Sequence, residues 1–588
     1  MELFKILARP YRKKYLPMAL AAVFFMLCDI AIGLFIPMVT KNIYTEINNG
    51  SNNLGFVYQT GLIVIAIALA AVVTTIMNNI FAQYLSTKIT ADIRNELFEK
   101  IQALSFTNVD RITSGALMTI VTSDTNQIQQ IIMMSFRAIL RSPLTLVGAV
   151  VMAYFLNADL FIIILVIVPI LGISIWVIIQ KATNNFIDMQ KRLDSLNTKL
   201  LETVNGAREI KSFVTEEEEL IKFDIVNGKY TQSIIKAEKL MSYLNPVIIL
   251  ISNIGIGVVL LVGSTLMMKY TGYMKADMAG IIFSYIAYLQ QIIMSLMMLS
   301  MVSIQISRGA VSAKRIDSVM KVVINIVDKE ESIDDFEIEG GIEFREVSFG
   351  YLDEEGTIGG ETLQNINLNI PPKSVVGVIG STGSGKTSLV QLIPRLYDVT
   401  KGEVLIDGVN VKDISLQTLR NQISYVTQEA IIFLGTIESN IRQGKDDANI
   451  DEIELAAKDA VADEFIEKLD GKYQATIHQG GANLSGGQKQ RLALARALIR
   501  KPKILILDDS TSAVDAKSEA LIKANLLENK NQTTIIVAQK ISSIQNCDQI
   551  IVLDNSGQID GFGDHLSLLK NSKVYQEIYT SQFGGHYE

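Results

Sequence analysis

Long apolar runs dominate the first 300 residues of the chain. The first run, Pro17–Val39, has 23 residues, which as a helix would extend about 34 Å and exceed the ~30 Å hydrocarbon core of a bilayer. It is too long for the core of a signal peptide, and no clear cleavage site follows it. Five comparable runs complete a prediction of six membrane-spanning helices: Phe56–Ala82, Ile139–Leu156, Ala158–Ile179, Leu244–Met268 and Ala276–Ser300.

The connections between these runs alternate in length. Those near residues 40–55, at 157 and near 269–275 are short, whereas those at 83–138 and 180–243 are long and hold most of the remaining Lys and Arg. Further basic residues precede the first run. Because cytoplasmic segments carry the excess of Lys and Arg, we place the N-terminus and both long connections in the cytoplasm. An even number of spans returns the second half of the chain to that side.

The long connections have helical patterns of their own. In the first, apolar residues recur every three or four positions and so line one face of a helix, which would extend the second span by about 33 Å. A break is expected at Thr107–Gly115, and a returning helix at Leu117–Arg137. The second connection repeats this plan, with the acidic run Glu216–Glu219 near its tip. Such helices can carry movement between a soluble domain and the spans. The first stripe consists of Leu85, Ile89, Ile93, Leu97, Ile101 and Leu104.

Composition agrees with a membrane domain joined to a soluble one. The chain is 49% hydrophobic and 19% charged, with a mean hydropathy of +0.30, which excludes a disordered chain and an ordinary soluble enzyme. The first 320 residues have a net charge of +6 and the remainder −14. Only two cysteines, Cys28 and Cys547, and three histidines occur, so a disulfide scaffold is excluded and a zinc site is not expected.

Two features of the spans have more than one interpretation. Asp29 lies inside the first span, where a carboxyl group is costly; it is either a contact for a cation or proton in a substrate path, or a neutral, hydrogen-bonded group near the outer interface. The last span is rich in Met and Gln, including Gln291 and Met294. Methionine suits adaptable binding surfaces, and packing against lipid or other helices explains it equally well.

A phosphate-binding motif identifies the chemistry of the second half. The acidic stretch Asp328–Glu339 is predicted to be a linker, and short predicted strands then alternate with helices. A predicted strand, Ser374–Ile379, leads into G-x-x-x-x-G-K-T, and a helix, Ser388–Leu396, follows. In this context the backbone N–H groups surround phosphates, the Lys reaches the β- and γ-phosphates, and the Thr hydroxyl holds Mg²⁺. The ATP-binding residues expected here are Gly380, Ser381, Thr382, Gly383, Ser384, Gly385, Lys386, Thr387 and Ser388.

A second apolar strand ends in an acidic residue. Lys503–Leu507 is followed directly by Asp508, which fits a buried strand whose terminal carboxylate orients Mg²⁺. We therefore expect Asp508 to complete the metal site with Thr387.

Between these two motifs lies the sequence Leu484-Ser485-Gly486-Gly487-Gln488, ahead of a predicted helix Lys489–Arg500. Here the chain resembles the ATP-binding-cassette (ABC) transporters, whose signature is LSGGQ. The resemblance covers nearly the whole chain and follows the order of exporter half-transporters. It implies an α-helical membrane domain of six helices with long cytoplasmic extensions (the type I, or type IV, exporter fold) fused to an α/β P-loop nucleotide-binding domain.

Other marks of the family assign further residues by resemblance. Tyr351 resembles the aromatic residue that stacks on adenine, Gln428 the Q-loop residue that contacts Mg²⁺ and the cytoplasmic extensions, and Asp515 the end of the D-loop. In this family two nucleotide-binding domains enclose two ATP molecules head to tail. The signature residues and Asp515 would therefore act on the ATP of a partner chain.

Two positions depart from the family pattern. Asp509 follows Asp508 where the family usually has a catalytic Glu. The side chain of Asp is one methylene shorter, so its carboxylate lies about 1–1.5 Å farther back, and misplacement on that scale can cost on the order of 100-fold in rate. Gln539 stands where the family has a switch His, and an amide cannot carry an imidazolium charge. Either the site tolerates both changes, or this chain binds ATP and hydrolyses it poorly.

A chain that binds ATP and hydrolyses it poorly resembles a subunit of the bacterial heterodimeric multidrug exporters. This resemblance predicts ATP- and Mg²⁺-dependent export of amphipathic or hydrophobic compounds across the cytoplasmic membrane, with a non-identical partner that supplies a Glu and a switch His. The alternatives are a homodimeric ABC ATPase that exports lipid or peptide, and a mainly regulatory ATP-binding subunit. We expect contact with the lipid bilayer and no nucleic-acid partner. The predicted domains are 1–320 (membrane), 321–340 (linker) and 341–588 (nucleotide-binding).

Overall fold

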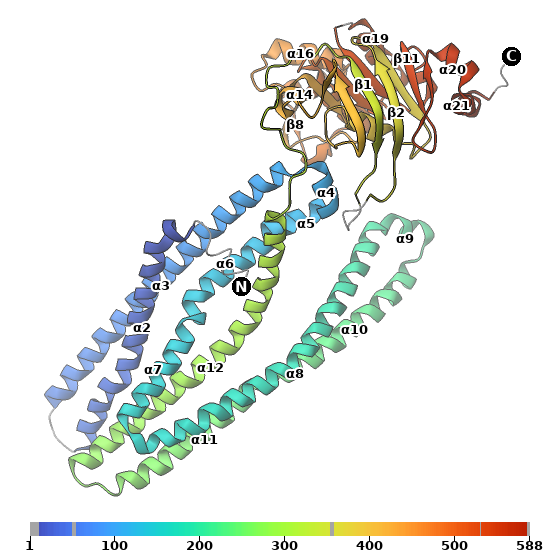
Figure 1. The fold of residues 1–588 in the computed structure, drawn as a ribbon. Helices are drawn as coiled ribbons and strands as arrows, with labels where there is room; N and C mark the ends of the chain where they lie inside the picture. Colours follow the sequence, from blue (N-terminus) through green and yellow to red (C-terminus); the bar gives the residue numbers. More distant parts are fainter. Residues whose placement is uncertain (1–10, 50–53, 353–357, 530, 585–588) are drawn as a thin grey trace. The chain divides into compact units, whose positions relative to one another are not determined.

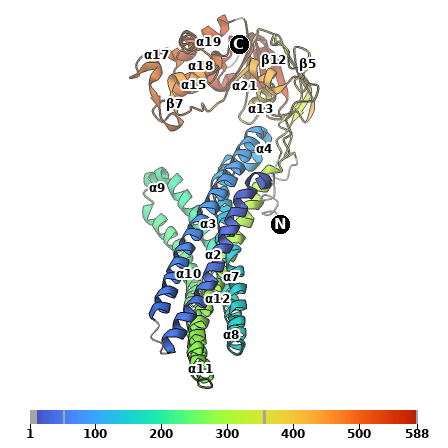
Figure 2. The same ribbon diagram turned by 90° about the vertical axis from the view of Figure 1, so that its left-hand side faces the viewer.

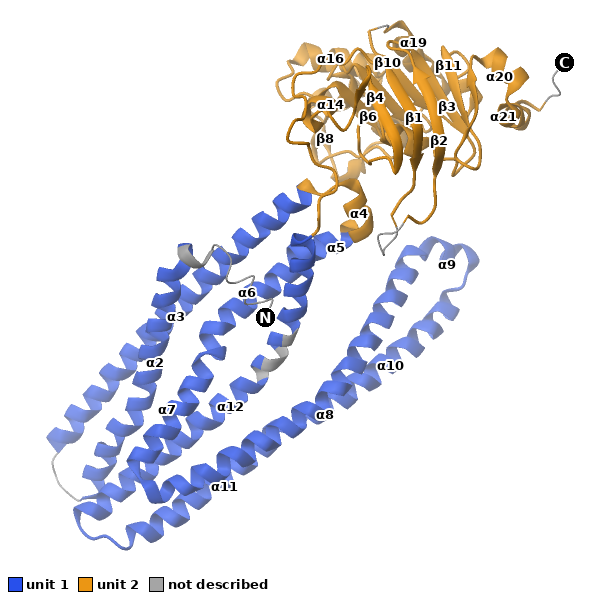
Figure 3. Ribbon diagram, in the orientation of Figure 1, with its two compact units in different colours: residues 1–102, 115–321 blue, residues 103–114, 322–588 orange. Residues whose placement is uncertain are grey.

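The computed structural model describes residues 11–49, 54–352, 358–529 and 531–584. Within those limits the chain divides into two compact units, coloured separately in Figure 3. The first, the membrane unit, comprises residues 1–102 and 115–321. The second, the nucleotide unit, comprises residues 103–114 and 322–588.

The membrane unit is entirely helical (Figure 1). Six helical stretches of its described residues are long and apolar enough to cross a bilayer, which confirms the prediction of six spans. Its elements are α2 (Tyr11–Asn48), α3 (Leu54–Ala103), α5 (Ser114–Thr119), η1 (Ile120–Asp124), α6 (Thr125–Met134), η2 (Ser135–Ile139), α7 (Arg141–Leu156), α8 (Ala158–Asn205), α9 (Ala207–Phe213), α10 (Glu216–Ser242), α11 (Leu244–Met267) and α12 (Tyr273–Met320).

The helices continue well beyond the apolar runs, as the stripe in the first connection predicts. Helix α3 is unbroken as far as Ala103, and Leu85, Ile93 and Leu97 on its stripe are buried. Helices α8 and α10 lie side by side as a hairpin that α9 closes (Figures 1 and 2). The acidic run at the start of α10 suits a helix N-terminus, and Lys199 pairs with Glu219 at 2.6 Å.

The helix that returns from the first connection contains two π-helical segments that the pattern did not predict, η1 and η2. The second has a local cause. Pro143 has no N–H group to donate to the carbonyl of Ile139, and the preceding turn is widened, with the Leu140 N–H bonded to the Ser135 carbonyl at 3.0 Å. Such segments often occur at functional sites.

Close helix packing holds the outer ends of the spans together. Buried side chains of α7, α8, α11 and α12 form one cluster, with Tyr285 and Leu289 fully enclosed. A Cβ atom at Gly255 would lie 2.7 Å from Ile167, and one at Gly263 would lie 2.6 Å from Ile282. Glycine at these two positions lets neighbouring helices approach, as is usual in membranes.

The nucleotide unit is built on two main sheets. A mostly parallel sheet has the order β12-β11-β3-β10-β9-β6, and an antiparallel sheet has the order β2-β1-β4-β5. The strands are β1 (Ile342–Phe349), β2 (Leu363–Ile370), β3 (Val375–Gly380), β4 (Lys401–Ile406), β5 (Val409–Asn410), β6 (Ile423–Val426), β7 (Gly435–Thr436), β8 (Thr476–Ile477), β9 (Ile504–Asp508), β10 (Thr533–Val537), β11 (Gln549–Leu553) and β12 (Ile559–Gly563).

The central strands β3, β9 and β10 are buried over their whole length, as expected for a parallel sheet covered on both faces. Because β10 pairs in parallel with both β3 and β9, their carboxyl ends meet at one edge, where ligands bind in such sheets. The helices are α4 (Phe106–Ile112), α13 (Lys386–Gln391), α14 (Leu416–Gln422), α15 (Ile437–Arg442), α16 (Ile450–Asp459), α17 (Asp463–Ile466), α18 (Gly486–Leu498), α19 (Ala516–Glu528), α20 (His565–Asn571) and α21 (Lys573–Phe583).

Two helices, α13 and α18, have other boundaries than the sequence predicts, and α18 ends at Leu498 rather than Arg500. Helix α13 begins at Lys386, inside the phosphate-binding motif, and ends at Gln391 rather than Leu396. Helix α18 begins at Gly486 rather than Lys489 because Ser485 caps it three residues earlier than the apolar pattern begins. The expected break after α3 contains the short helix α4, which belongs to the nucleotide unit.

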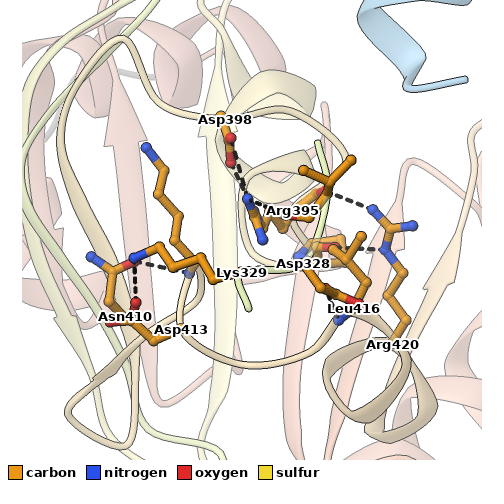
Figure 4. A network of polar contacts seen from close by, with 11 residues as sticks. Asp328, Lys329, Arg395, Asp398, Asn410, Asp413, Leu416 and Arg420 are labelled. Carbon is orange, nitrogen blue, oxygen red and sulfur yellow. Dashed lines mark hydrogen bonds and ion pairs between the residues drawn. The ribbon is translucent and has the colours of Figure 1, made fainter. Parts of the chain in front are cut away.

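The start of the acidic segment before β1 is bound to other parts of the nucleotide unit (Figure 4). The carboxylate of Asp328 accepts a hydrogen bond from the Leu416 N–H at 2.8 Å, and Lys329 pairs with Asp413. The buried Arg395 donates to Asp398 at 2.9 Å and to the carbonyl of Val327 at 3.4 Å. These contacts fix the segment that enters the nucleotide unit.

Candidate nucleotide-binding site

The loop between β3 and α13 has a backbone that only glycine fits at several positions. Gly383 and Gly385 both have φ of +88°, which L-residues with side chains rarely adopt. A Cβ atom at Gly385 would lie 2.8 Å from Leu363, and one at Gly380 would lie 2.6 Å from the Leu553 carbonyl. The glycines of the motif therefore shape a tight loop of the kind whose N–H groups surround an anion.

Lys386 is folded into this loop. Its ammonium group donates to the carbonyls of Gly380 at 2.9 Å and Ser381 at 2.8 Å. Burial lowers the pKa of Lys386, while Asp509 and Asp508 act in the opposite direction. The Ser384 hydroxyl is buried here without a hydrogen-bond partner among the described residues. A half-buried cation and a buried, unpartnered hydroxyl fit the oxygens of a bound phosphate.

Asp508 lies at the end of β9 and is hydrogen-bonded on both oxygens. Thr387 donates to one at 3.0 Å and the Tyr425 hydroxyl donates to the other at 2.8 Å. Burial, together with Asp508, raises the pKa of Tyr425, so this phenol stays protonated and able to donate. Thr387 and Asp508 are thus adjacent, as the sequence predicts. They are suitable oxygen ligands for Mg²⁺, which when bound neutralises charge on the phosphates of ATP.

Asp509, Gln539 and Gln428 come together beside this pair. One oxygen of Asp509 accepts hydrogen bonds from the side-chain amides of Gln539 at 2.8 Å and Gln428 at 3.3 Å. Burial and the neighbouring Asp508 raise the pKa of Asp509, against the opposing effect of Gln539 and two lysines. Asp509 has a left-handed backbone, with φ of 48°, a conformation that Asp tolerates better than most residues.

Tyr351 is packed against aromatic neighbours and helix α13. Its ring meets Phe349 and Tyr397 edge to face, with centroids 4.9 and 5.4 Å away. Its hydroxyl shares a hydrogen bond of 2.9 Å with Ser388. The ring is 39% exposed, so part of its surface is open to a ligand. Stacking of this ring on adenine stays a prediction.

Helix α4 contacts the same cluster of aromatic side chains. Asp110 accepts a hydrogen bond from the Tyr397 hydroxyl at 2.6 Å, and Phe106 lies 6.1 Å from the Tyr397 ring. Burial, reinforced by Asp110, raises the pKa of Tyr397. Sequence reasoning missed Tyr397, Tyr425 and Asp110; for the pair Asp110–Tyr397 the chain offers no local signal, because 287 positions separate the two residues.

The signature residues form a separate surface with the D-loop. Ser485 and Gln488 make a capping box at the start of α18, with hydrogen bonds of 3.3 and 2.8 Å between side chains and backbone, so their spacing has a structural reason. A Cβ atom at Gly487 would lie 2.7 Å from the Ala513 carbonyl. Asp515 caps α19 through the Ser518 N–H at 3.0 Å. The signature glycines therefore lie against the D-loop at Ala513 and Val514, directly before Asp515.

Comparisons with known proteins agree with this geometry. Residues 19–296 match the family model of the ABC transporter transmembrane region, and residues 363–512 match the ABC transporter model. The chain is 36% identical to the uncharacterized ABC transporter ATP-binding protein YfiB of Bacillus subtilis, over 98% of both chains. It is 34% identical to an ATP-dependent lipid A-core flippase of Syntrophus aciditrophicus, over 86% of this chain and 82% of the relative.

A solved structure shows the same fold. The structure of a bacterial Atm1-family ABC exporter with ATP bound superposes with a TM-score of 0.79 and 24% identity, and covers 97% of this chain and 99% of that one. The order of spans and nucleotide unit is thus shared along the whole length.

Proposed function

We propose that this chain, which belongs to the ABC transporters, is one half of an exporter heterodimer that moves amphipathic or hydrophobic compounds and whose own ATP site hydrolyses slowly. Membership makes the chain a multi-pass membrane protein with a cytoplasmic nucleotide-binding domain that binds ATP and drives export. The proposal concerns the partner, the substrate and the division of hydrolysis between two sites.

The proposal of slow hydrolysis is based on the length and the hydrogen bonds of the Asp509 side chain. A general base must reach the proton it removes, but the Asp509 carboxylate is one methylene shorter than that of Glu and is bound by two amide groups. Gln539 can donate to a phosphate oxygen and cannot carry a transferable proton. The pocket therefore has the groups to hold ATP and lacks a side chain that reaches an attacking water.

The need for a second chain is supported by two surfaces. The signature and D-loop form a complete surface apart from the P-loop, suited to the ATP of another chain. In the membrane unit, none of α9 is buried, and Phe213 and Val214 at its end are 76% and 81% exposed. An apolar tip of this kind marks an interaction site. We infer that the partner is non-identical and supplies the Glu and His that this chain lacks.

A second candidate is a homodimeric exporter of lipid. One observation favours it: the relatives include ATP-dependent lipid A-core flippases. In that case Asp509 would serve as the general base for ATP hydrolysis in both copies.

Steady-state ATP turnover of the chain expressed alone and placed in lipid nanodiscs tests the proposal. We expect tight ATP binding with little hydrolysis by the chain alone. In the complex with its partner, the double variant Asp509→Glu/Gln539→His should raise hydrolysis at this chain's own site about 100-fold, because the longer carboxylate reaches the attacking water and the imidazole can titrate. Gln545→His, which adds an imidazole at an exposed position of the same unit, serves as the control and should change nothing.

Robust turnover by the unmodified chain alone would favour the homodimer and overturn the proposal. No gain in the double variant would show that Asp509 and Gln539 are not the cause of slow hydrolysis. A mainly regulatory role has a different result: in the complex with a partner, Lys386→Ala would then slow transport without abolishing it.

A further inference from the structure

A cavity with several polar side chains in its lining lies among three helices of the membrane unit. It has a volume of about 280 Å³ and lies between α2, α7 and α12, within the membrane-spanning part of the chain. That volume is at the low end for ligand pockets, so it suits the head of a molecule rather than the whole of a large one. The residues on which the argument depends are Asp29, Gly33, Arg141, Ser142, Thr145 and Gln291.

Hydrogen-bonding atoms in this cavity have no partner. The hydroxyl oxygens of Ser142 and Thr145 and the amide oxygen of Gln291 are buried and unpaired among the described residues, and Ser142 as a whole is only 3% exposed. An unpaired polar atom in a bilayer is costly. The three residues that hold these atoms all line one cavity, so a ligand bound there would lie beside all three unpaired groups.

The orientation of Gln291 follows from a proline in the facing helix. Pro37 has no N–H group to donate to the carbonyl of Gly33 four residues earlier. The Gln291 amide N–H₂ donates to that carbonyl instead, at 2.9 Å. This contact fixes the side chain and leaves its oxygen, an acceptor, without a partner among the described residues.

The charges at the cavity cancel. Arg141 pairs with Asp29 at 2.7 Å, and Thr75 donates to the other carboxylate oxygen at 2.6 Å. Sequence analysis singled out Asp29 but did not identify its basic partner. A charged group within the spans is expected to pair in this way. The paired charges give the cavity no net charge with which to select an ionic head group.

From these observations we infer that the cavity binds the head of an uncharged amphiphile, through hydroxyl or amide groups, with the apolar tail along Ile30, Met294 and Met298. This rests on the proposed export of amphipathic compounds and names their class. Ser142 and Thr145 can each donate or accept, and Gln291 accepts. Met side chains adapt to tails of different shape.

Equilibrium binding of four tritiated decyl probes to the full chain in phosphatidylcholine nanodiscs, without nucleotide, tests the inference. The probes share one tail: decyl maltoside is uncharged, decylphosphocholine is zwitterionic, decyltrimethylammonium is cationic and decanesulfonate is anionic. We expect saturable binding of decyl maltoside, at least tenfold tighter than that of either singly charged probe.

Two variants and their controls locate the binding. Ser142→Ala/Thr145→Val removes two hydrogen-bonding groups and should weaken decyl maltoside binding about tenfold. Ser252→Ala is the matched control, since its buried hydroxyl is also unpartnered but does not line the cavity. Gly33→Leu fills open space in the cavity and should also weaken binding, whereas Gly257→Leu on α11, also next to open space, should not.

A third variant tests the charge argument. Asp29→Asn keeps the shape of the side chain and leaves the charge of Arg141 uncompensated, so decanesulfonate should bind at least tenfold more tightly than to the unmodified chain. Equal effects of Ser142→Ala/Thr145→Val and Ser252→Ala, non-saturable binding, or an unmodified chain that prefers decanesulfonate would each overturn the inference. If binding behaves as expected but transport fails, the site stands and the proposed function fails.

Discussion

The P-loop edge and the signature surface of the nucleotide unit satisfy their polar groups in different ways. At the P-loop edge, side chains bond to one another or to the loop: Lys386 to loop carbonyls, Asp509 to two amides, and Tyr351 to Ser388. At the signature surface, the backbone is fixed by the capping box of α18 and by close contact of Gly487 with the D-loop.

Because of this difference, the two regions must respond differently when nucleotide binds. The P-loop edge must exchange internal hydrogen bonds for contacts with ATP, so its affinity depends on what the internal bonds cost to break. The signature surface offers N–H groups of a capped helix of 13 residues that need no rearrangement, and such groups attract an anion as they stand. In the function that we propose, the P-loop edge holds the chain's own ATP and the signature surface serves the hydrolysis of a partner's.

The largest expected effect is at the signature surface. Gly487→Val would bring a side chain within 2.7 Å of the Ala513 carbonyl, a backbone atom that cannot move aside easily. Displacement of the signature should lower ATP turnover of the transporter purified with its partner at least 100-fold.

Nucleotide affinity of the chain's own pocket is the control for Gly487→Val, and it should stay within twofold because the P-loop is not touched. Unchanged turnover would show that the signature surface does not act on a partner's ATP, and the contrast between the two regions would lose its functional meaning.

The next effect is at the P-loop edge. Tyr351→Ala removes a ring available for stacking and should weaken ATP binding about tenfold, since stacking on a base contributes about 1–3 kcal/mol. Tyr351→Phe keeps the ring and removes only the hydrogen bonds of the hydroxyl, to Ser388 and Gln391, so its affinity should remain near that of the unmodified chain. Titration with a fluorescent ATP analogue measures both. Equal loss in the two variants would assign the effect to the hydroxyl rather than to stacking.

The sequence predicts the fold and the motifs well because they depend on local patterns. Six apolar runs predict six helices, and a strand followed by G-x-x-x-x-G-K-T predicts the geometry around Lys386. The end of β9 places Asp508 beside Thr387 because parallel strands have a common edge. These features need no knowledge of distant contacts.

Features set by distant contacts were not predicted. Tyr397 meets Asp110 only because α4, which is distant in sequence, is part of the folded nucleotide unit. The partner of Asp29 is Arg141, which lies on another span, and no pattern in either helix joins them. The early start of α18 was missed because the apolar periodicity begins after its capping residues, Ser485 and Gln488.

A smaller effect tests whether the signature surface is fixed by its cap. Ser485→Ala removes the side chain that accepts from the Gln488 N–H, and loss of a cap of this kind costs about 1 kcal/mol. Hydrogen exchange at the start of α18 in the full chain should therefore be about fivefold faster. Ser415→Ala, which removes the cap of α14, is the matched control and should accelerate exchange in α14 alone. Unchanged exchange in α18 would mean that contact with the D-loop is sufficient to fix it.

The smallest expected effect is at Asp509. Asp509→Asn keeps the size of the side chain and an oxygen that can accept from Gln539, so the polar group beside the P-loop should persist. Because we propose that this carboxylate does not reach an attacking water, ATP turnover of the transporter with its partner should change less than twofold. Asp508→Asn, one residue earlier, should instead weaken Mg²⁺-dependent ATP binding strongly, since Asp508 is held between Thr387 and Tyr425. A loss of tenfold or more in Asp509→Asn would show that the P-loop edge of this chain performs hydrolysis itself, and that its internal hydrogen bonds open during each cycle.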